Sequence, residues 1–562
     1  MDVVGEEKTK PSSAVGRFIV PRLAPAAIVF VGGFVPIAVA MHFGALGIAR
    51  NDDGTYLQSA FRLADTGKLN GGVSTTNLVG QLVLSLPVVW AFGHRIAALQ
   101  IEVAALGVGG LLAVFDFAKQ LLSPRRALFV SVMVAVGPMW ASLSASYMTD
   151  VPGFALAMAC LALGARGVRR DGVRVGYLCA SLAVGYLGFT IREFAIVAPL
   201  AVGIAAISIA RHGPRARLAA IAGAVVSVVA LAAIFYWWRQ SLPGFASPIL
   251  PGLSLSALTT GTHKTVQSGL LVGILVLPAV VLAGPRRLLR AAYARAPRAM
   301  PAVGIATCVG LGGQEIRLRH SAAFIGPGNY VLTNGVLGAN FAGPRPDLLP
   351  RSLFAILALC GVLSFAVLLC AAVPAALDGI ARVSRPRFET GLAPPLVILL
   401  LAVLGYTALY VVPQAFGFPV YDRYLLPLVP LVGTLALSPG AGKVPVARQR
   451  RFAGCVALLL LAVVGAAYAA NSASYDGTKW RVATRVASLA GSPKRVDAGG
   501  EWEGYMAGEL SSAPATPRRA CVLVREEESR PLTADAGVLR VGRVWGLVGP
   551  QVWIVARKTR PC

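Results

Sequence analysis

The sequence predicts an all-α polytopic membrane protein with a small outer domain at its carboxyl end. Of the 562 residues, 56% are hydrophobic and only 14% are charged, and the mean hydropathy is +0.68. Such a chain is too apolar for a water-soluble protein. Its apolar residues gather in runs long enough to cross a hydrocarbon core of roughly 30 Å, about thirteen such runs in all. Clusters of basic residues separate these runs.

The basic clusters account for much of the formal net charge of +27. Short clusters of arginine between apolar runs are typical of cytoplasmic loops under the positive-inside rule. The charge therefore indicates topology, and no nucleic-acid partner is expected. The clusters lie at Arg166–Arg170, Arg211–Arg217, Arg286–Arg287, Arg382–Arg387 and Arg448–Arg451.

The first apolar run, residues 24–46, is long enough to cross the membrane. No small-residue cleavage site follows it, so the sequence predicts an uncleaved helix rather than a signal peptide. Residues 1–23 precede this helix and are assigned to a cytoplasmic tail. The loop that follows this helix, residues 47–96, is therefore expected on the outer side of the membrane.

Within this loop, residues 76–93 form a further apolar segment. Polar residues introduce it and Pro87 interrupts it, so we expect a juxtamembrane or re-entrant helix that does not cross. This assignment keeps the basic loop Lys119–Arg126 inside. The remaining spans are predicted at 97–118, 127–146, 151–167, 173–190, 193–210, 216–238, 266–284, 299–313, 351–377, 392–413, 423–438 and 452–470.

The chain divides into a transmembrane module, residues 24–440, a cytoplasmic basic loop with the last helix, residues 441–470, and an outer domain, residues 471–562. In the outer domain Gly, Ser, Pro and charged residues become more frequent, and four tryptophans lie among short β-branched runs. This pattern predicts a small extracytoplasmic domain that contains strands. Its cysteines, Cys521 and Cys562, are candidates for a disulfide in an oxidising compartment, and two free thiols are the alternative.

An acidic pair, Asp52 and Asp53, follows the first span at the predicted outer membrane surface, and Tyr56 comes one turn later. Carboxylates are costly to hold at a lipid boundary and are therefore functional candidates there. The alternative is that the pair only caps the next helix, because aspartate favours that position.

Three further polar motifs are predicted on the same outer face: Asp150 at the start of a span, Arg192-Glu193 between two spans, and Arg423-Tyr424 at the start of a late span. Each motif has a structural alternative. Asp150 suits a helix start, Arg192-Glu193 suits an interfacial ion pair, and Arg423-Tyr424 suits an aromatic belt with a snorkelling arginine.

Carboxylates and arginines around one pocket suit transfer of a group from a phosphate-linked donor. A carboxylate can deprotonate or orient an attacking hydroxyl, and arginine binds a departing phosphate in a planar fork. Soluble nucleotide sugars are not expected outside the cell membrane, and the sequence contains no Gly-x-x-x-x-Gly-Lys loop. The expected donor is therefore membrane-resident, such as a polyprenyl-phosphate sugar.

The stretch from Asp52 to Lys68 resembles the first outer loop of GT-C membrane glycosyltransferases, especially the protein O-mannosyltransferase and lipid A aminoarabinose transferase group. Thr149-Asp150 is similar to the second acidic motif of that group, and Arg423–Pro427 to its late Arg-Tyr-x-x-Pro element. The resemblance covers roughly residues 24–440. It implies an inverting transferase that uses a polyprenyl-phosphate sugar.

By this resemblance, the catalytic residues are Asp52, Asp53 and Asp150, and the donor or its phosphate is bound by Arg192, Glu193, Tyr56, Arg423 and Tyr424. One departure concerns the segment after the first loop. Many relatives have a His/Lys-Pro-Pro-Leu element there, whereas this chain reads Thr75–Gln81 without it. The identity of the sugar therefore stays open.

The five histidines are scattered, so no metal site built by the protein alone is expected. A divalent metal held by the carboxylates and the donor phosphate stays open. The competing functions are a transporter or flippase for a lipid-linked saccharide, whose outer charges would line a pathway, and a polysaccharide polymerase of another membrane family. The expected partners are the lipid-linked donor, membrane lipids and an outer glycan, lipid or protein acceptor. The plasma membrane is the expected location, with the amino terminus cytoplasmic and the active site outside.

Overall fold

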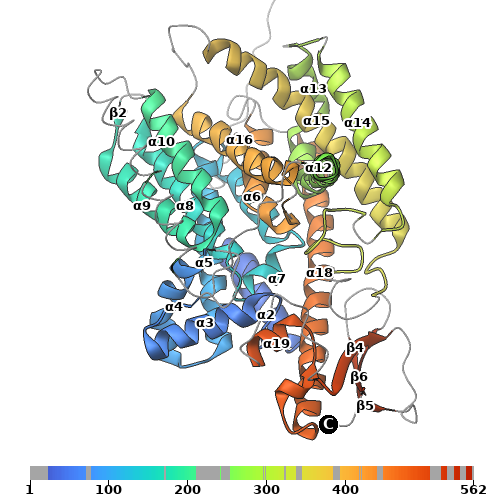
Figure 1. Ribbon diagram of the computed structural model, residues 1–562. Coiled ribbons are helices and arrows are strands. Elements are labelled where there is room, and N and C mark those ends of the chain that lie inside the picture. Colours follow the sequence, from blue (N-terminus) through green and yellow to red (C-terminus); the bar gives the residue numbers. More distant parts are fainter. Residues whose placement is uncertain are drawn as a thin grey trace, which may run out of the picture.

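The structure is a computed structural model, and its description is restricted to part of the chain. The described residues are 23–70, 77–169, 172–209, 229, 241, 254–294, 296–297, 299–321, 324–336, 345–383, 393–416, 418, 420–438, 447–506, 520–527, 537–544 and 552–559. Helices dominate this part, and a small sheet lies near the carboxyl end (Figure 1).

The amino-terminal half begins with a helix from Leu23 to His42, which contains a π-helical turn, η1 (Phe30–Phe34), before α2 (Val35–His42). After it come α3 (Asp53–Thr66), α4 (Val79–Phe92), α5 (Ile96–Lys119), α6 (Pro124–Ala135), α7 (Trp140–Ser144), α8 (Asp150–Gly167), the two-residue strands β1 (Val168–Arg169) and β2 (Gly172–Val173), α9 (Val175–Ile191), the 3-10 helix η2 (Glu193–Ile196) and α10 (Val197–Ile209).

The second half contains longer helices. They are α12 (Leu255–Ala283), α13 (Pro285–Tyr293), α14 (Ala299–Leu318), α15 (Arg351–Val383), α16 (Pro394–Ala415), the 3-10 helix η3 (Asp422–Leu425), α17 (Leu428–Leu437) and α18 (Arg448–Leu489).

Within the described residues, six helices are long and apolar enough to cross a membrane. Each overlaps a predicted span, and they are Leu23–His42, Ile96–Lys119, Leu255–Ala283, Arg351–Ala372, Pro394–Ala415 and Arg448–Leu489. The all-α polytopic class predicted from the sequence is confirmed. Shorter helices occupy most other predicted spans, while the span predicted at 216–238 lies almost wholly outside the described residues.

One predicted span differs in its continuity. The sequence predicts an unbroken helix over 127–146, whereas α6 ends at Ala135 and the short α7 begins only at Trp140. Gly137 and Pro138 lie in the gap, and proline cannot donate the backbone hydrogen bond that would continue a helix. After the break and the short α7, the chain continues to α8, which begins at Asp150.

Close helix packing joins the amino-terminal helices. Helices α5 and α8 approach so closely that a Cβ atom added to Gly110 would lie 2.7 Å from the Cα of Ala155. Glycine is required at such a contact because any side chain would meet backbone. This packing fixes α8, and hence the residue at its start, against the rest of the bundle.

The loop predicted at residues 47–96 contains the two helices α3 and α4. Helix α4 covers the segment predicted as juxtamembrane or re-entrant, and Pro87 lies inside it. Helix α3 is amphipathic and buries Tyr56, Leu57 and Phe61 along one face. It ends at Gly67, whose φ of 66° is left-handed, the conformation that glycine adopts at helix ends.

Helix α18 continues well beyond residue 470, where the sequence predicts that the last span ends, and reaches Leu489. A four-stranded sheet packs against its outer part, with strand order β3-β4-β6-β5 (Figure 1). Its strands are β3 (Val496–Asp497), β4 (Val522–Glu527), β5 (Val538–Val544) and β6 (Val552–Lys558), and the short helix α19 (Gly500–Met506) follows β3. Strand β3 is parallel to β4, and the other pairs are antiparallel.

This unit confirms the predicted β-containing region at the carboxyl end. Its apolar core combines Val482 and Val486 of α18 with Trp502 of α19 and Ile554 of β6. Cys521, at the start of β4, is disulfide-bonded. Cys562, the partner predicted for it, lies outside the described residues.

Candidate active site

The first outer loop places Asp52 at the position just before α3. Its side chain makes no capping hydrogen bond to that helix. Instead, Oδ2 of Asp52 accepts hydrogen bonds from Nη1 of Arg423 at 3.3 Å and from Nη2 at 3.2 Å. The side chain is 52% exposed. Asp52 is therefore a carboxylate open to solvent and aimed at an arginine, and helix capping does not explain it.

Its neighbour Asp53 is fully buried. One carboxylate oxygen accepts a hydrogen bond from the backbone N–H of Arg50, and the other accepts from the N–H of Tyr147 at 3.0 Å. Burial raises the pKa of the Asp53 carboxyl from 3.8 to about 8, and the two N–H groups oppose that shift. The geometry makes Asp53 a link between the first outer loop and the segment before α8.

Arg423 lies at the centre of the site, on η3, with a side chain that is only 5% exposed. Besides its contact with Asp52, its Nε atom lies 3.8 Å from Oδ1 of Asp150. The rings of Tyr330, Tyr421 and Tyr424 surround the guanidinium, with centroids 5.8, 5.3 and 5.7 Å from Cζ. A buried arginine enclosed in this way is not a snorkelling one, which would keep its charge in water.

The residue before it, Asp422, holds the segment in place. Its Oδ2 atom accepts hydrogen bonds from the backbone N–H groups of Tyr330 at 2.8 Å and Val331 at 2.6 Å. This ties η3 to the segment 324–336, which supplies the ring of Tyr330. Burial raises the pKa of Asp422 to about 6, while these N–H donors and Arg423 lower it.

Asp150 and Arg192 form the second half of the site. Asp150 is the first residue of α8, and Arg192 follows the last residue of α9 in an extended conformation. Nη2 of Arg192 lies 3.3 Å from Oδ1 of Asp150, and both side chains are buried. The guanidinium also donates to Oγ1 of Thr149 at 3.1 Å and lies over the ring of Tyr424, 4.7 Å from its centroid.

Two aspartates and two arginines are thus brought together, as the sequence predicts for Asp52, Asp150, Arg192 and Arg423. Their formal charges balance. Several buried polar atoms of this cluster have no hydrogen-bond partner among the described residues: both carboxylate oxygens of Asp150, Nη2 of Arg192 and Nε of Arg423. Nη2 of Arg192 and Nε of Arg423 face Oδ1 of Asp150 at 3.3 and 3.8 Å, so the charges of these atoms are paired although the atoms form no aligned hydrogen bond.

The other predicted site residues lie nearby in the chain. Tyr56 is on the buried face of α3, one turn after Asp52. Glu193 begins η2 directly after Arg192. In the part of the chain that the structure describes, no group of three His, Cys, Asp or Glu side chains lies close enough to hold a metal ion.

Two participants were not predicted. Tyr330 belongs to a segment with no helical or strand pattern, and its ring packs beside Arg423. Arg50 lies two residues before Asp52 and is almost completely buried. Its position next to the acidic pair was a signal in the sequence, since a single arginine beside two aspartates differs from the basic clusters of the loops.

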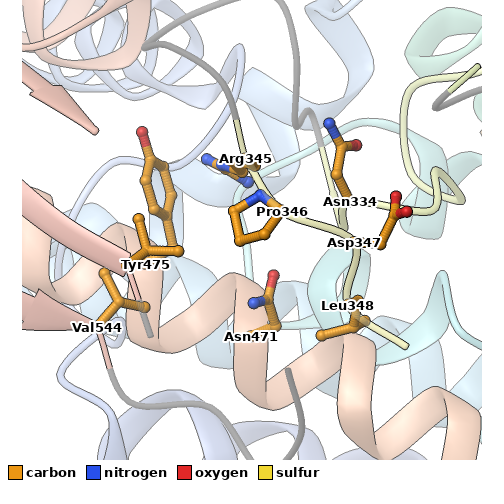
Figure 2. Close-up of a pocket in the computed structure, with 9 residues that line it drawn as sticks. Asn334, Arg345, Pro346, Asp347, Leu348, Asn471, Tyr475 and Val544 are labelled. Carbon is orange, nitrogen blue, oxygen red and sulfur yellow. The ribbon is translucent and has the colours of Figure 1, made fainter. Parts of the chain in front are cut away.

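A separate small pocket lies where α18 meets the segment 345–348 and the carboxyl-terminal sheet (Figure 2). Asn471 and Tyr475 of α18 face Arg345 and Pro346 across it, and Val544 of β5 closes one side (Figure 2). The guanidinium of Arg345 lies 3.4 Å from the ring centroid of Tyr475 and also pairs with Glu526 of β4. These contacts attach the outer sheet to the membrane module.

Comparison with known proteins gives one family match and several similar solved structures. Residues 83–238 match the family model described as dolichyl-phosphate-mannose-protein mannosyltransferase. This stretch includes Asp150 and Arg192. The match confirms the predicted resemblance to GT-C membrane glycosyltransferases of the mannosyltransferase group. No curated protein sequence matches the chain.

Among solved structures, the chain is similar to ArnT from Cupriavidus metallidurans in the apo state, with 15% identity, a TM-score of 0.41, and coverage of 95% of this chain and 98% of that one. The same ArnT bound to undecaprenyl phosphate gives 14% identity, a TM-score of 0.39, and coverage of 97% and 98%. The archaeal oligosaccharyltransferase AglB from Archaeoglobus fulgidus, in complex with an inhibitory peptide and a dolichol-phosphate, gives 10% identity, a TM-score of 0.32, and coverage of 92% and 62%.

Proposed function

We propose that this protein is an integral membrane glycosyltransferase that moves a sugar from a polyprenyl-phosphate donor to an outer glycan, lipid or protein, with inversion at the sugar carbon. The observation that carries the proposal is the contact between the exposed carboxylate of Asp52 and the buried guanidinium of Arg423. In this proposal Asp52 is the base, Arg423 binds the phosphate, and the two side chains are in contact. The match of residues 83–238 to a dolichyl-phosphate-mannose family supports the class of donor.

In the proposed reaction, Asp52 accepts the proton of the acceptor hydroxyl, whose oxygen attacks the anomeric carbon of the sugar. The bond from that carbon to the phosphate oxygen breaks, and the phosphate departs with the electron pair. Asp52 suits this role because it is the one site carboxylate that is substantially exposed. A single displacement on the face opposite the phosphate inverts the configuration.

Arg423 and Arg192 are assigned to the donor phosphate. Their guanidinium groups flank Asp150, with Nη2 of Arg192 and Nε of Arg423 at 3.3 and 3.8 Å from Oδ1 of that carboxylate. Arginine binds phosphate in a planar fork and stabilises the charge that develops on it. Asp150 holds the two guanidinium groups in register, and the rings of Tyr421 and Tyr424 limit their movement.

Asp53 is assigned a different role from Asp52. Because it is buried and accepts two backbone hydrogen bonds, it cannot meet an acceptor hydroxyl without unfolding the loop. We assign Asp53 a structural role: it stabilises the turn that positions Asp52. We place the site on the outer face of the plasma membrane, following the basic clusters of the sequence.

Sugar transfer by purified protein in lipid vesicles tests the proposal. The vesicles contain a polyprenyl-phosphate sugar with a radiolabelled sugar, and candidate acceptors are added outside. Release of polyprenyl phosphate together with label on an acceptor supports the transferase. Movement of intact labelled lipid between the leaflets, without cleavage of the sugar–phosphate bond, would instead establish a flippase.

A further inference from the structure

Arg50 is a buried charged residue next to the proposed site, and its guanidinium has three partners. Its side chain is 1% exposed. Nε lies 2.8 Å from Oδ2 of Asp476, Nη2 donates to Oγ of Ser472 at 2.9 Å, and Nη1 donates to the carbonyl oxygen of Ala145 at 3.4 Å. Asp476 and Ser472 both lie on the outer part of α18. One guanidinium therefore joins the first outer loop, the segment before α8 and the last long helix.

The backbone around Arg50 explains why this junction matters for Asp52. The N–H of Arg50 donates to the carboxylate of Asp53. The next residue, Asn51, has a φ of 57°, a left-handed conformation that asparagine adopts more readily than most other residues with a side chain. Its Nδ2 donates to Oη of Tyr330 at 2.8 Å. Arg50 anchors the turn on one side, and Asp53 anchors it on the other through the N–H of Tyr147.

A second contact ties the same loop to the carboxyl-terminal unit. Nε2 of Gln58 on α3 donates to the backbone oxygen of Tyr505 on α19 at 2.8 Å. A Cβ atom added to Gly54 would lie 2.7 Å from the carbonyl oxygen of Glu501, so α3 and α19 are in close backbone contact there. The outer part of α18 is itself braced by Tyr475 against Arg345 (Figure 2). The first loop thus rests on a structure formed largely by the last hundred residues.

We propose that Arg50 is a positioning residue for the transfer reaction: by anchoring the first outer loop to Asp476 and Ser472, it makes the orientation of Asp52 depend on the outer part of α18. The inference rests on the proposed function of Asp52. It gives α18 a role in the reaction, although Asp476 lies 426 residues from Arg50 in the sequence.

Loosening this anchor should affect the chemical step more than donor binding. The turn at Asn51 would relax, and a base displaced by about 1 Å can lose on the order of 100-fold in rate. Arg192 has supports outside this loop in Asp150 and Tyr424, and Arg423, which also pairs with Asp52, keeps its contacts with Asp150 and Tyr424. Their affinity for the donor should change little.

The test compares Asp476→Asn, Arg50→Lys and the double variant with the wild type, and uses Glu527→Gln as the matched control. Glu527 accepts from Arg557 at 2.7 and 2.9 Å, so the control also converts an ion-paired carboxylate of the carboxyl-terminal unit to an amide. We expect kcat to fall at least about 10-fold in both single variants, with the KM for the donor within about twofold. The double variant should be no slower than the worse single one, because both changes break one contact.

Hydrogen–deuterium exchange of the peptide covering residues 46–60 provides a readout that does not depend on activity. Exchange of this peptide should accelerate in Asp476→Asn and stay unchanged in Glu527→Gln. Unchanged kcat in folded Asp476→Asn, additive losses in the double variant, or unchanged exchange would each overturn the inference. If Arg50→Lys does not fold, Ser472→Ala replaces it. If the wild type transfers no sugar, the proposed function fails, while the exchange result still decides whether Arg50 anchors the loop.

Discussion

Replacing Asp52 with asparagine separates a catalytic role from a structural one. Asparagine has almost the same volume but cannot accept a proton from an acceptor hydroxyl. Loss of a positioned base lowers a rate by about 100-fold or more, which corresponds to at least about 2.7 kcal/mol in the activation free energy. We therefore expect kcat for sugar transfer to fall by at least that factor.

The structure predicts a much smaller effect on stability. The contact that the variant weakens is an ion pair with N–O distances of 3.2 and 3.3 Å, and the Asp52 side chain is 52% exposed. Solvent screens such a pair, and exposed ion pairs contribute only about 0–1 kcal/mol. Asparagine also keeps an oxygen that can accept from Arg423. The free energy of unfolding should therefore fall by less than about 1 kcal/mol.

The assay measures transfer from a polyprenyl-phosphate sugar in reconstituted vesicles, alongside thermal unfolding in detergent. Asp65→Asn is the matched control, because Asp65 lies near the other end of α3 and pairs with His94 at 3.0 Å on the protein surface. The control should keep full activity. Near-normal turnover in a folded Asp52→Asn protein would refute the assignment of Asp52 as the base.

Three other expectations follow from the site and the topology. Burial raises the pKa of Asp53 to about 8, so the folded state binds more protons than the unfolded state between pH 3.8 and about 8, and thermal stability should fall as the pH rises through this window. Asp53→Asn should flatten that dependence in the same melting experiment. Arg192→Ala should raise the KM for the donor about 10- to 100-fold by removing a charge-assisted contact to phosphate, with a smaller change in kcat; an unchanged KM would exclude the phosphate role. A cysteine introduced at Ser74 should react with a membrane-impermeant thiol reagent in intact cells, and one at Ser123 should not; labelling at Ser123 would show that residues 76–93 cross the membrane, contrary to the re-entrant assignment.

The polar residues of the site could be predicted because the surrounding chain is so apolar. Charged residues lie where a hydrophobic run begins or ends at Asp52, Asp150 and Arg423. A charge at such a boundary raises the free energy of the folded protein, so its presence suggests a function. Long-range partners could not be predicted in this way. Nothing in the sequence near Arg50 points to Asp476, and Tyr330 lies in a segment without periodicity.

Helix ends were predictable to different degrees. Gly137 and Pro138 lie at the break between α6 and α7. Hydropathy is high on both sides of them, so the sequence predicts one unbroken span there. The opposite error occurs in α18. The composition changes near residue 471 because the helix leaves the predicted membrane region, whereas the helix continues to Leu489. Residues of this extension, such as Val482 and Val486, pack against the carboxyl-terminal sheet, and this tertiary contact supports the helix where hydropathy gives no signal.

The length of α18 has a mechanical consequence. Its 42 residues, at about 1.5 Å per residue, extend about 63 Å, roughly twice the thickness of the hydrocarbon core. One half of the helix is long enough to cross that core, and the other half carries the sheet. A tilt of about 10° would shift a point about 30 Å beyond the core sideways by about 5 Å and would change its height by less than about 1 Å. A change in the tilt of α18 would therefore move the sheet along the membrane surface rather than away from it.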